Sequence, residues 1–372
     1  MIEKPSICVI ISDANRGGML LTILEALSKK ARSLDVVILA PKEVELITEL
    51  GEIEINSTLI MCSSRFSYIY SAFKFGRLLQ KSQYSYILAS GHKASLIGMI
   101  SAKFIGIENR FFIRHHSDFH HFQDLSPIKS FLGLLYDRLT NLFSTKIISI
   151  SETVRSSLIN IDGVKPNKIK LIYNGIDLNK YEKLRDFTKL HSKYSESDDP
   201  QIGCMARISK LKGIVHVVEA FEKFLEIKPH AKLLIAGAPS DSWTQVKSAL
   251  DRLPKESWTH YEHLDTANFL SKLDVFIHVP IREYAEAYGL VFMESIASGL
   301  QCVFTKSGII REIESCEKYF HVVKYESSED IYTSLKNIFI QKSLKPVYPI
   351  EKLKKYDQSY MAQEYLSMLN LK

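Results

Sequence analysis

Cysteine pairs are missing from this chain of 372 residues, which has five cysteines and no CxxC motif. Zinc sites and disulfide frameworks both depend on cysteines at short or regular spacings. The five are scattered, and several fall in apolar runs: Cys8, Cys62, Cys204, Cys302 and Cys316. We therefore expect buried, reduced thiols in a cytoplasmic protein rather than disulfides or zinc ligands.

The sequence also lacks an apolar run of transmembrane length, which is about 20 residues. Its start does not read as a signal peptide, because the short apolar run 7–11 lies between Glu3 and Asp13. We expect a cytoplasmic protein that is either in solution or peripheral on the inner face of the cytoplasmic membrane.

The composition is otherwise that of an ordinary globular protein, with 46% hydrophobic and 24% charged residues. Its length exceeds that of most single domains, so two domains are expected. The net charge of +6 is unevenly spread: residues 65–114 contain eight basic residues and one acidic residue. A basic half-domain of this kind favours an anionic lipid or nucleic acid as a partner.

Short apolar runs alternate with helical segments along both halves of the chain. Strands are predicted at 6–12, 35–40, 57–62, 84–90, 110–114, 146–149 and 168–173, and then at 201–205, 232–236, 273–279, 302–305 and 320–323. Such alternation is typical of parallel sheets covered by helices. The polar stretch 179–199 shows little periodicity and is interpreted as the linker between domains 1–178 and 200–355.

The most informative stretch runs from Glu286 to Gly299. It follows a predicted strand, and its apolar residues after Gly289 recur at helical spacing. The amides of Gly289, Leu290 and Val291 would then point out of a helix N-terminus, where an anion is favoured. Glu286 and Glu294 flank this position, and carboxylates repel phosphate. The simplest explanation is that each accepts hydrogen bonds from sugar hydroxyls on either side of a diphosphate.

Arg207 and Lys212 follow the first strand of the second half, and Gly237 follows the next strand. A guanidinium fork and an ammonium point charge can hold two phosphoryl groups together. By themselves the two cations would be interpreted as a solvated surface pair. The predicted helix that begins after Gly289, about eighty residues later, has an N-terminus that favours an anion. Together with this helix, the two cations are interpreted as a diphosphate clamp.

Two features of the first half lie at strand ends. Gly17 and Gly18 are in the predicted loop after the first strand, where they form either a tight turn or the opening of a Rossmann-type unit. His115, His116, His120 and His121 follow the strand at 110–114. Their spacing lacks the geometry and the acidic third ligand of a hydrolytic zinc site, so no metal is expected. We expect one or two of them to face a ligand.

The segment 66–80 predicts an amphipathic helix in which aromatic residues alternate with Lys74 and Arg77. A core helix is the default interpretation of such a segment. A membrane-surface helix is the alternative, because aromatic and basic residues together suit the lipid interface.

Together these signatures resemble the family 4 retaining glycosyltransferases of the GT-B fold, over nearly the whole chain. The resemblance also includes Ser151-Glu152, Asn174-Gly175 and the spacing of Glu286 and Glu294. The resemblance implies two Rossmann-like, doubly wound α/β domains that face each other across a cleft. It also implies an acceptor domain, 1–178, joined by the C-terminal helix in 356–372, and a nucleotide-sugar domain, 200–355.

The same resemblance implies a role for each candidate residue. Arg207 and Lys212 would clamp the donor diphosphate, Glu294 would bind the ribose, and Glu286 would contact the transferred sugar and support the transition state. Backbone groups at Gly17, Gly18, Gly237, Gly289, Leu290 and Val291 would contact the donor. His115 or His116 would be the catalytic histidine. The chain departs from the family pattern at Gln301, where proline is usual, and in the spacing before Glu312, which leaves Glu312 without an assigned role.

We therefore predict a retaining, metal-independent and cofactor-free glycosyltransferase. It would move a sugar from a nucleotide-diphosphate sugar to an acceptor in lipopolysaccharide, O-antigen, capsule or exopolysaccharide assembly, with a membrane surface contacted by residues 65–114. Nucleic acid is not expected, because no binding motif accompanies the charge. The alternatives are a nucleotide-sugar epimerase on the same fold and an inactive nucleotide-sugar-binding scaffold. A dehydrogenase is disfavoured because neither half carries GxGxxG.

Overall fold

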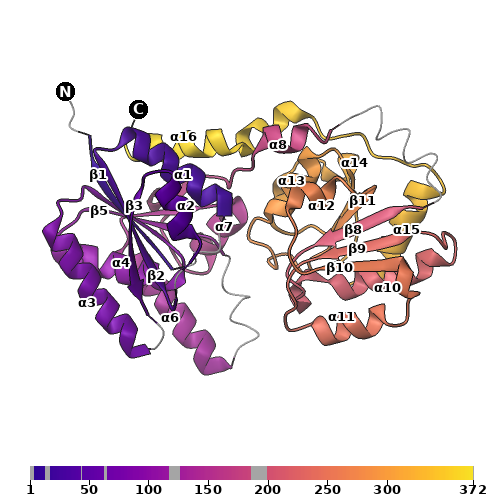
Figure 1. The fold of residues 1–372 in the computed structure, drawn as a ribbon, viewed down its shortest axis with the longest axis horizontal. Helices are drawn as coiled ribbons and strands as arrows, with labels where there is room; N and C mark the ends of the chain where they lie inside the picture. Colours follow the sequence, from indigo (N-terminus) through magenta and orange to yellow (C-terminus); the bar gives the residue numbers. More distant parts are fainter. Residues whose placement is uncertain are drawn as a thin grey trace. The chain divides into compact units, whose positions relative to one another are not determined.

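The computed structural model describes residues 4–12, 17–42, 44–62, 65–116, 126–185 and 199–371. They form two compact units, each with its own sheet and its own helices (Figure 1). Unit 1 comprises Met1–Gly175 with Gln358–Lys372, and unit 2 comprises Ile176–Asp357. The predicted α/β class with two Rossmann-like, doubly wound domains is confirmed.

The sheet of unit 1 has seven parallel strands in the order β3-β2-β1-β4-β5-β6-β7. Their bounds are β1 (Ser6–Ile11), β2 (Ser33–Ala40), β3 (Asn56–Met61), β4 (Tyr86–Ser90), β5 (Asn109–Arg114), β6 (Lys146–Ser149) and β7 (Ile169–Leu171). The order reverses between β1 and β4. At such a switch point, ligands bind beyond the carboxyl ends of the strands.

Helices on both faces cover this sheet (Figure 1). They are α1 (Gly17–Lys30), α2 (Leu46–Glu52), α3 (Arg65–Lys81), α4 (His92–Ile105), α6 (Pro127–Phe143), α7 (Glu152–Asn160), the 3-10 turn η1 (Pro166–Lys168) and α16 (Gln358–Met368). The predicted N-cap at Ser151 is confirmed, because its side chain accepts a hydrogen bond from the amide of Val154. The closing helix α16 packs against α1, where Thr22 Oγ1 donates to Gln358 Oε1 at 3.0 Å.

The sheet of unit 2 has six parallel strands in the order β10-β9-β8-β11-β12-β13. They are β8 (Gln201–Met205), β9 (Lys232–Ala236), β10 (Trp258–Tyr261), β11 (Val275–His278), β12 (Gln301–Phe304) and β13 (His321–Val322). Its helices are α8 (Leu178–Glu182), α10 (Ile214–Leu225), α11 (Trp243–Leu250), α12 (Thr266–Leu270), α13 (Leu290–Ala297), α14 (Cys316–Tyr319) and α15 (Ser328–Phe339). Short 3-10 turns are η2 (Lys210–Lys212), η3 (Lys255–Ser257), η4 (Gly308–Glu312), η5 (Ile350–Lys352) and η6 (Lys354–Tyr356).

The structure differs from the sequence prediction in three places. Gly17 and Gly18 form the first turn of α1 rather than a loop before it. Residues 178–182 of the predicted linker region form α8, because Leu178 and Tyr181 are apolar enough to be buried against α13. No element was predicted between 240 and 270, where α11, β10 and α12 lie.

Two further expectations concern burial. All five cysteines are buried and unbridged, as predicted. Of the basic residues in 65–114, Arg110 and Arg114 are buried, so they cannot meet a lipid surface.

The departure at Gln301 is structural, since its amide exchanges two hydrogen bonds of 2.9 Å with the backbone of Lys345. Among the described residues, no helix combines the length and apolarity that a bilayer crossing requires.

Candidate functional site

The first group of candidate residues gathers in unit 2, where the loop after β8 meets the segment after β11. Gly213 lies between η2 and α10 with a φ of 67°, in the left-handed region that favours glycine. A Cβ at this position would lie 2.2 Å from the carbonyl oxygen of Val279. The loop that carries Lys212 can therefore approach the end of β11 only because residue 213 has no side chain.

Lys212 and Glu286 form an ion pair there, and both side chains are largely buried. The same Glu286 oxygen, Oε1, lies 2.9 Å from Nε2 of His278, the last residue of β11. Burial by itself would raise the pKa of Glu286, but the charge of Lys212 and the bond to His278 outweigh it and lower the pKa to about 2. Glu286 is therefore a carboxylate at any ordinary pH.

The N-terminus of α13 follows directly. Gly289 precedes the helix with a φ of 81°, and a Cβ there would lie 2.6 Å from the ring of Phe292. Leu290 and Val291 form the first turn, whose amides have no carbonyl of the helix in front of them. The predicted helix start is confirmed, and it lies in sequence between the two glutamates.

Glu294 lies one turn further along α13. Its Oε1 accepts a hydrogen bond of 2.7 Å from the hydroxyl of Tyr181 in α8. Burial raises the pKa of Glu294, and the bond from Tyr181 opposes that rise. Beside this pair, Lys180 contacts Asp265, the N-cap of α12, at 2.7 Å. The α8 segment therefore holds two acidic side chains of unit 2.

A cavity of about 660 Å³ opens at the carboxyl ends of β8 and β9. Arg207, Gly237 and Asp265 line it, together with Met205, Ala236, Ala238, Glu262, His263 and Leu264. Arg207 is exposed, whereas Lys212 is paired with Glu286. The two predicted clamp residues thus have different neighbours: one lines the cavity and the other neutralises a glutamate.

The second group lies in unit 1, at the carboxyl ends of β4 and β5. His115 Nε2 lies 2.9 Å from Ser90 Oγ at the end of β4. His116 lies beside His92, the first residue of α4, with ring centroids 6.0 Å apart. His92 stacks on Tyr136 of α6 at 4.1 Å. His120 and His121 lie outside the described residues.

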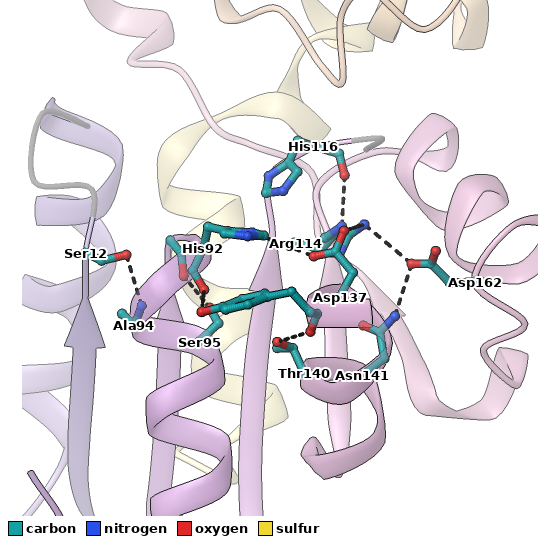
Figure 2. Close-up of polar contacts among 12 residues, drawn as sticks. Ser12, His92, Ala94, Ser95, Arg114, His116, Asp137, Thr140, Asn141 and Asp162 are labelled. Atoms are coloured by element: carbon teal, nitrogen blue, oxygen red, sulfur yellow. Dashed lines mark hydrogen bonds and ion pairs between the residues drawn. The ribbon is translucent and has the colours of Figure 1, made fainter. Parts of the chain in front are cut away.

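Arg114 holds this group together (Figure 2). Its side chain is only 2% exposed, and its guanidinium contacts both carboxylate oxygens of Asp137 at 3.0 Å. It also contacts Asp162 at 3.4 Å, and its Nε donates to the carbonyl oxygen of His116 at 3.0 Å. One buried cation thus connects the end of β5 to α6 and to the segment after α7, and it fixes the backbone at His116.

His92, His116 and Asp137 each offer an atom that could ligate a metal, all within 4.8 Å of one another. Only His116 of this set belongs to the four loop histidines, 115, 116, 120 and 121, considered from the sequence. Figure 2 shows the carboxylate of Asp137 turned to Arg114, which occupies both of its oxygens. The guanidinium already supplies the positive charge that a cation would bring, and this favours an ion-pair network over a metal site.

Sequence reasoning missed four residues of these groups: His278, Tyr181, Asp137 and His92. For His278 a signal existed, because it is the polar last residue of an apolar strand. For Asp137 and Tyr181 none existed, since their partners are far away in the sequence.

We predict that replacing Asp137 with asparagine destabilises the protein, because it leaves the buried Arg114 without its main counter-charge. Breaking a buried pair from one side costs about 3–5 kcal/mol. Urea unfolding of the full chain measures this cost. Glu25→Gln is the control, since the Glu25–Lys29 pair in α1 is exposed and is worth less than about 1 kcal/mol. Equal losses for the two variants would contradict the structural role of the Arg114 network.

Comparison with known proteins finds a family model that matches each half of the chain. The family model "Glycosyltransferase Family 4" matches residues 19–180, and "Glycosyl transferases group 1" matches residues 186–353. The chain is 26% identical over 310 residues to the capsular polysaccharide biosynthesis glycosyltransferase CapM of Staphylococcus aureus, covering 81% of this chain and 79% of CapM. It is 32% identical over 183 residues to N-acetyl-alpha-D-glucosaminyl L-malate synthase of Bacillus anthracis, covering 47% of this chain and 46% of that protein.

Among solved structures, HepE of Anabaena in complex with UDP and glucose superposes with a TM-score of 0.78 at 17% identity, covering 98% of this chain and 99% of HepE. Sucrose-phosphate synthase of Thermosynechococcus elongatus superposes with a TM-score of 0.76 at 15% identity, covering 98% of each chain. At these identities the likeness concerns the fold.

Proposed function

The chain belongs to glycosyltransferase family 4 and has the GT-B fold, and from this premise we propose that it transfers a sugar from a nucleotide-diphosphate sugar to an acceptor hydroxyl with retention at the anomeric carbon. The observation that carries the proposal is the arrangement in unit 2. An ionised Glu286 paired with Lys212 precedes a half-buried helix start, and a cavity lined by Arg207 lies at the ends of β8 and β9.

The donor diphosphate would bind at the start of α13. The amides of Leu290 and Val291 and the positive end of the helix favour an anion there. Lys212 would share its charge between Glu286 and the diphosphate, and Arg207 would add a guanidinium from the cavity side. These groups neutralise the leaving group without a metal or another cofactor. HepE of Anabaena forms complexes with UDP and with UDP-glucose, which supports this class of donor.

The two glutamates would then act on the sugars beside the diphosphate. Glu294 would accept hydrogen bonds from the ribose, with Tyr181 holding one of its oxygens. Glu286 stays ionised because of Lys212 and His278, so it can accept bonds from hydroxyls of the transferred sugar and stabilise positive charge on the anomeric carbon. No carboxylate need form a covalent intermediate. Attack on the same face, assisted by the departing phosphate, accounts for retention.

The acceptor side is assigned to unit 1. His116, whose backbone Arg114 fixes, and His115, bonded to Ser90, lie at the carboxyl ends of β4 and β5, near the switch point of the sheet. Gly17 and Gly18, in the first turn of α1, lie after the neighbouring strand β1. We propose that one of the two histidines contacts the acceptor or the transferred sugar, and that the glycine pair lets a ligand approach the backbone.

The acceptor we propose is a lipid-linked or cell-envelope glycan, as in capsule, O-antigen, lipopolysaccharide or exopolysaccharide assembly, with the enzyme peripheral on the cytoplasmic membrane. CapM, whose name places it in capsular polysaccharide biosynthesis, supports this class. The surface of unit 1 supports it too. Helices α3, α4 and α6 pack side by side (Figure 1) and expose large apolar side chains: Tyr70, Phe73, Phe104, Ile128, Phe131, Leu132, Leu135 and Leu142.

Basic side chains lie on the same helices. Lys74, Arg77 and Lys81 of α3 are exposed, as are Lys93 and Lys103 of α4. Arg77 lies over the ring of Phe73 at 4.4 Å, so its charge and an aromatic ring share one position on the surface. Aromatic, aliphatic and cationic groups together suit the boundary between lipid headgroups and acyl chains.

The donor site is tested by calorimetric titration of the protein with UDP-glucose, UDP-N-acetylglucosamine and GDP-mannose. For the donor that binds, we predict that Arg207→Ala and Glu294→Ala each weaken binding roughly 10- to 100-fold, since a hydrogen bond to a charged group is worth about 1.5–3 kcal/mol. Turnover of this donor should give a product whose NMR spectrum shows the anomeric configuration of the donor.

The control is Glu222→Ala, because Glu222 forms an exposed ion pair with Arg252 and neither residue lines the cavity. It should bind the donor as the wild type does. Unchanged binding in both Arg207→Ala and Glu294→Ala would overturn the site, and an inverted product would overturn the stereochemical assignment.

The membrane contact is tested by sedimentation with vesicles of phosphatidylcholine alone or with phosphatidylglycerol. We predict binding to the anionic vesicles at low salt and its loss at high salt, because exposed charges are screened. The triple variant Lys74→Gln, Arg77→Gln, Lys81→Gln should bind roughly 100-fold more weakly, at about 1 kcal/mol for each charge. Lys223→Gln with Lys247→Gln and Arg252→Gln, in unit 2, is the matched control, since it removes the same number of exposed charges. Absence of binding at low salt would remove the membrane proposal.

A further inference from the structure

A histidine that the sequence does not single out lies at the centre of the donor site. His278 ends β11, in the middle of the unit 2 sheet, and is only 2% exposed. Aromatic rings surround it: Phe292 meets it edge to face at 4.6 Å, and Phe276 lies 6.4 Å away. A polar ring in such surroundings is costly unless its nitrogens find partners.

The partner of its Nε2 atom is Oε1 of Glu286, at 2.9 Å. A carboxylate can only accept a hydrogen bond, so Nε2 must carry the proton. This fixes the tautomer of the ring and the direction of its N–H bond.

Burial lowers the pKa of His278, the carboxylate of Glu286 opposes that effect, and the ammonium of Lys212 reinforces it. The lowered pKa favours the neutral ring at neutral pH. Glu286 and Lys212 are the charged groups that act on the ring, and their charges cancel. A neutral Nε2–H donor beside an ion pair leaves the three side chains together without net charge.

Lys212 and His278 differ in how firmly they can hold Glu286. Lys212 has a flexible stem with four carbons, and its charge is also needed by the diphosphate. His278 has two side-chain torsions, both restricted by the packing of its ring against Phe292 and Phe276. If a donor drew Lys212 toward its phosphates, the bond from His278 would remain as a hold on Glu286.

We propose that His278 is a positioning residue of the transferase: its Nε2–H group fixes the carboxylate of Glu286 in the orientation that contacts the transferred sugar, while Lys212 moves its charge to the leaving diphosphate. The inference rests on the proposed role of Glu286. His278, a buried strand residue, would hold Glu286 more precisely than the flexible side chain of Lys212 can. Precision matters because small displacements of a catalytic group lower turnover steeply.

Two substitutions separate the hydrogen bond from the packing. His278→Phe keeps an aromatic ring against Phe292 and removes the donor. His278→Gln keeps an N–H group at a comparable distance from the backbone. With the donor that the wild type turns over in the panel above, we expect His278→Phe to lower kcat roughly 10- to 100-fold with donor KM nearly unchanged. His278→Gln should recover most of the loss.

The pH profile supplies a readout that a packing defect would not change. In the wild type Glu286 is ionised above a pKa of about 2, so its protonation does not limit kcat near neutral pH. Removing the His278 donor raises the pKa of Glu286, because burial then opposes ionisation with only Lys212 against it. In His278→Phe, kcat should therefore fall as the pH drops through the raised value, at a higher pH than in the wild type.

The matched control is His321→Phe. His321 lies in β13 of the same sheet, is also buried, and has a pKa lowered to about 4 mainly by burial. This variant alters a buried histidine near Lys345 rather than at Glu286, so its kcat and acid limb should equal those of the wild type. If His278→Phe fails to fold, nitrogen-15 NMR of the wild-type histidines still decides: a protonated Nε2 with an unprotonated Nδ1 supports the proposal, and any other state of His278 overturns it.

Glu286→Gln distinguishes this inference from the function on which it rests. Full turnover by Glu286→Gln would overturn the proposed role of Glu286 and the positioning role with it. An inactive Glu286→Gln beside a fully active His278→Phe would overturn the positioning role alone. Equal losses of kcat in His278→Phe, His278→Gln and His321→Phe would assign His278 to stability and would likewise overturn it.

Discussion

The ion pair between Lys212 and Glu286 is the interaction on which the proposed donor site of unit 2 depends. It joins two loops that follow neighbouring strands, β8 and β11, and it keeps a buried carboxylate ionised against the cost of its own desolvation. The pair forms only because Gly213 lets one loop pass the end of the other strand. In the proposed function an incoming diphosphate would take over Lys212, and Glu286 would keep His278 as its second partner.

Unit 1 also contains a buried ion-pair network, centred on Arg114, but its effect is different. Arg114 ends β5 and, like the pair in unit 2, is buried, but it contacts two carboxylates and a backbone carbonyl, so its charge is fully committed. It therefore orders the loop at His116 instead of offering charge to a ligand. The difference follows from chemistry: a guanidinium presents a rigid fork to several acceptors, whereas an ammonium is a mobile point charge.

Much of this architecture could be predicted from the sequence, because strand and helix periods are local properties. The bounds of β8, β9 and β6 agree with those expected, and Glu286 and Glu294 lie where the helix start at Gly289 placed them. The partners of those residues could not be predicted. Tyr181 meets Glu294 across 113 positions and Asp137 meets Arg114 across 23, and no local pattern records such contacts. From the sequence alone, Arg114 counts among the basic residues that could meet a lipid surface. This expectation is wrong for the same reason, since the carboxylate partners that bury Arg114 lie in distant elements.

The decisive measurement is a structure of the protein with the nucleoside diphosphate of its donor bound. We predict phosphate oxygens at hydrogen-bonding distance, about 2.7–3.2 Å, from Lys212 Nζ and from the amides of Leu290 and Val291. The ribose should contact Glu294, and His278 should still hold Glu286. A diphosphate bound away from the start of α13, with the pair between Lys212 and Glu286 undisturbed, would contradict this prediction.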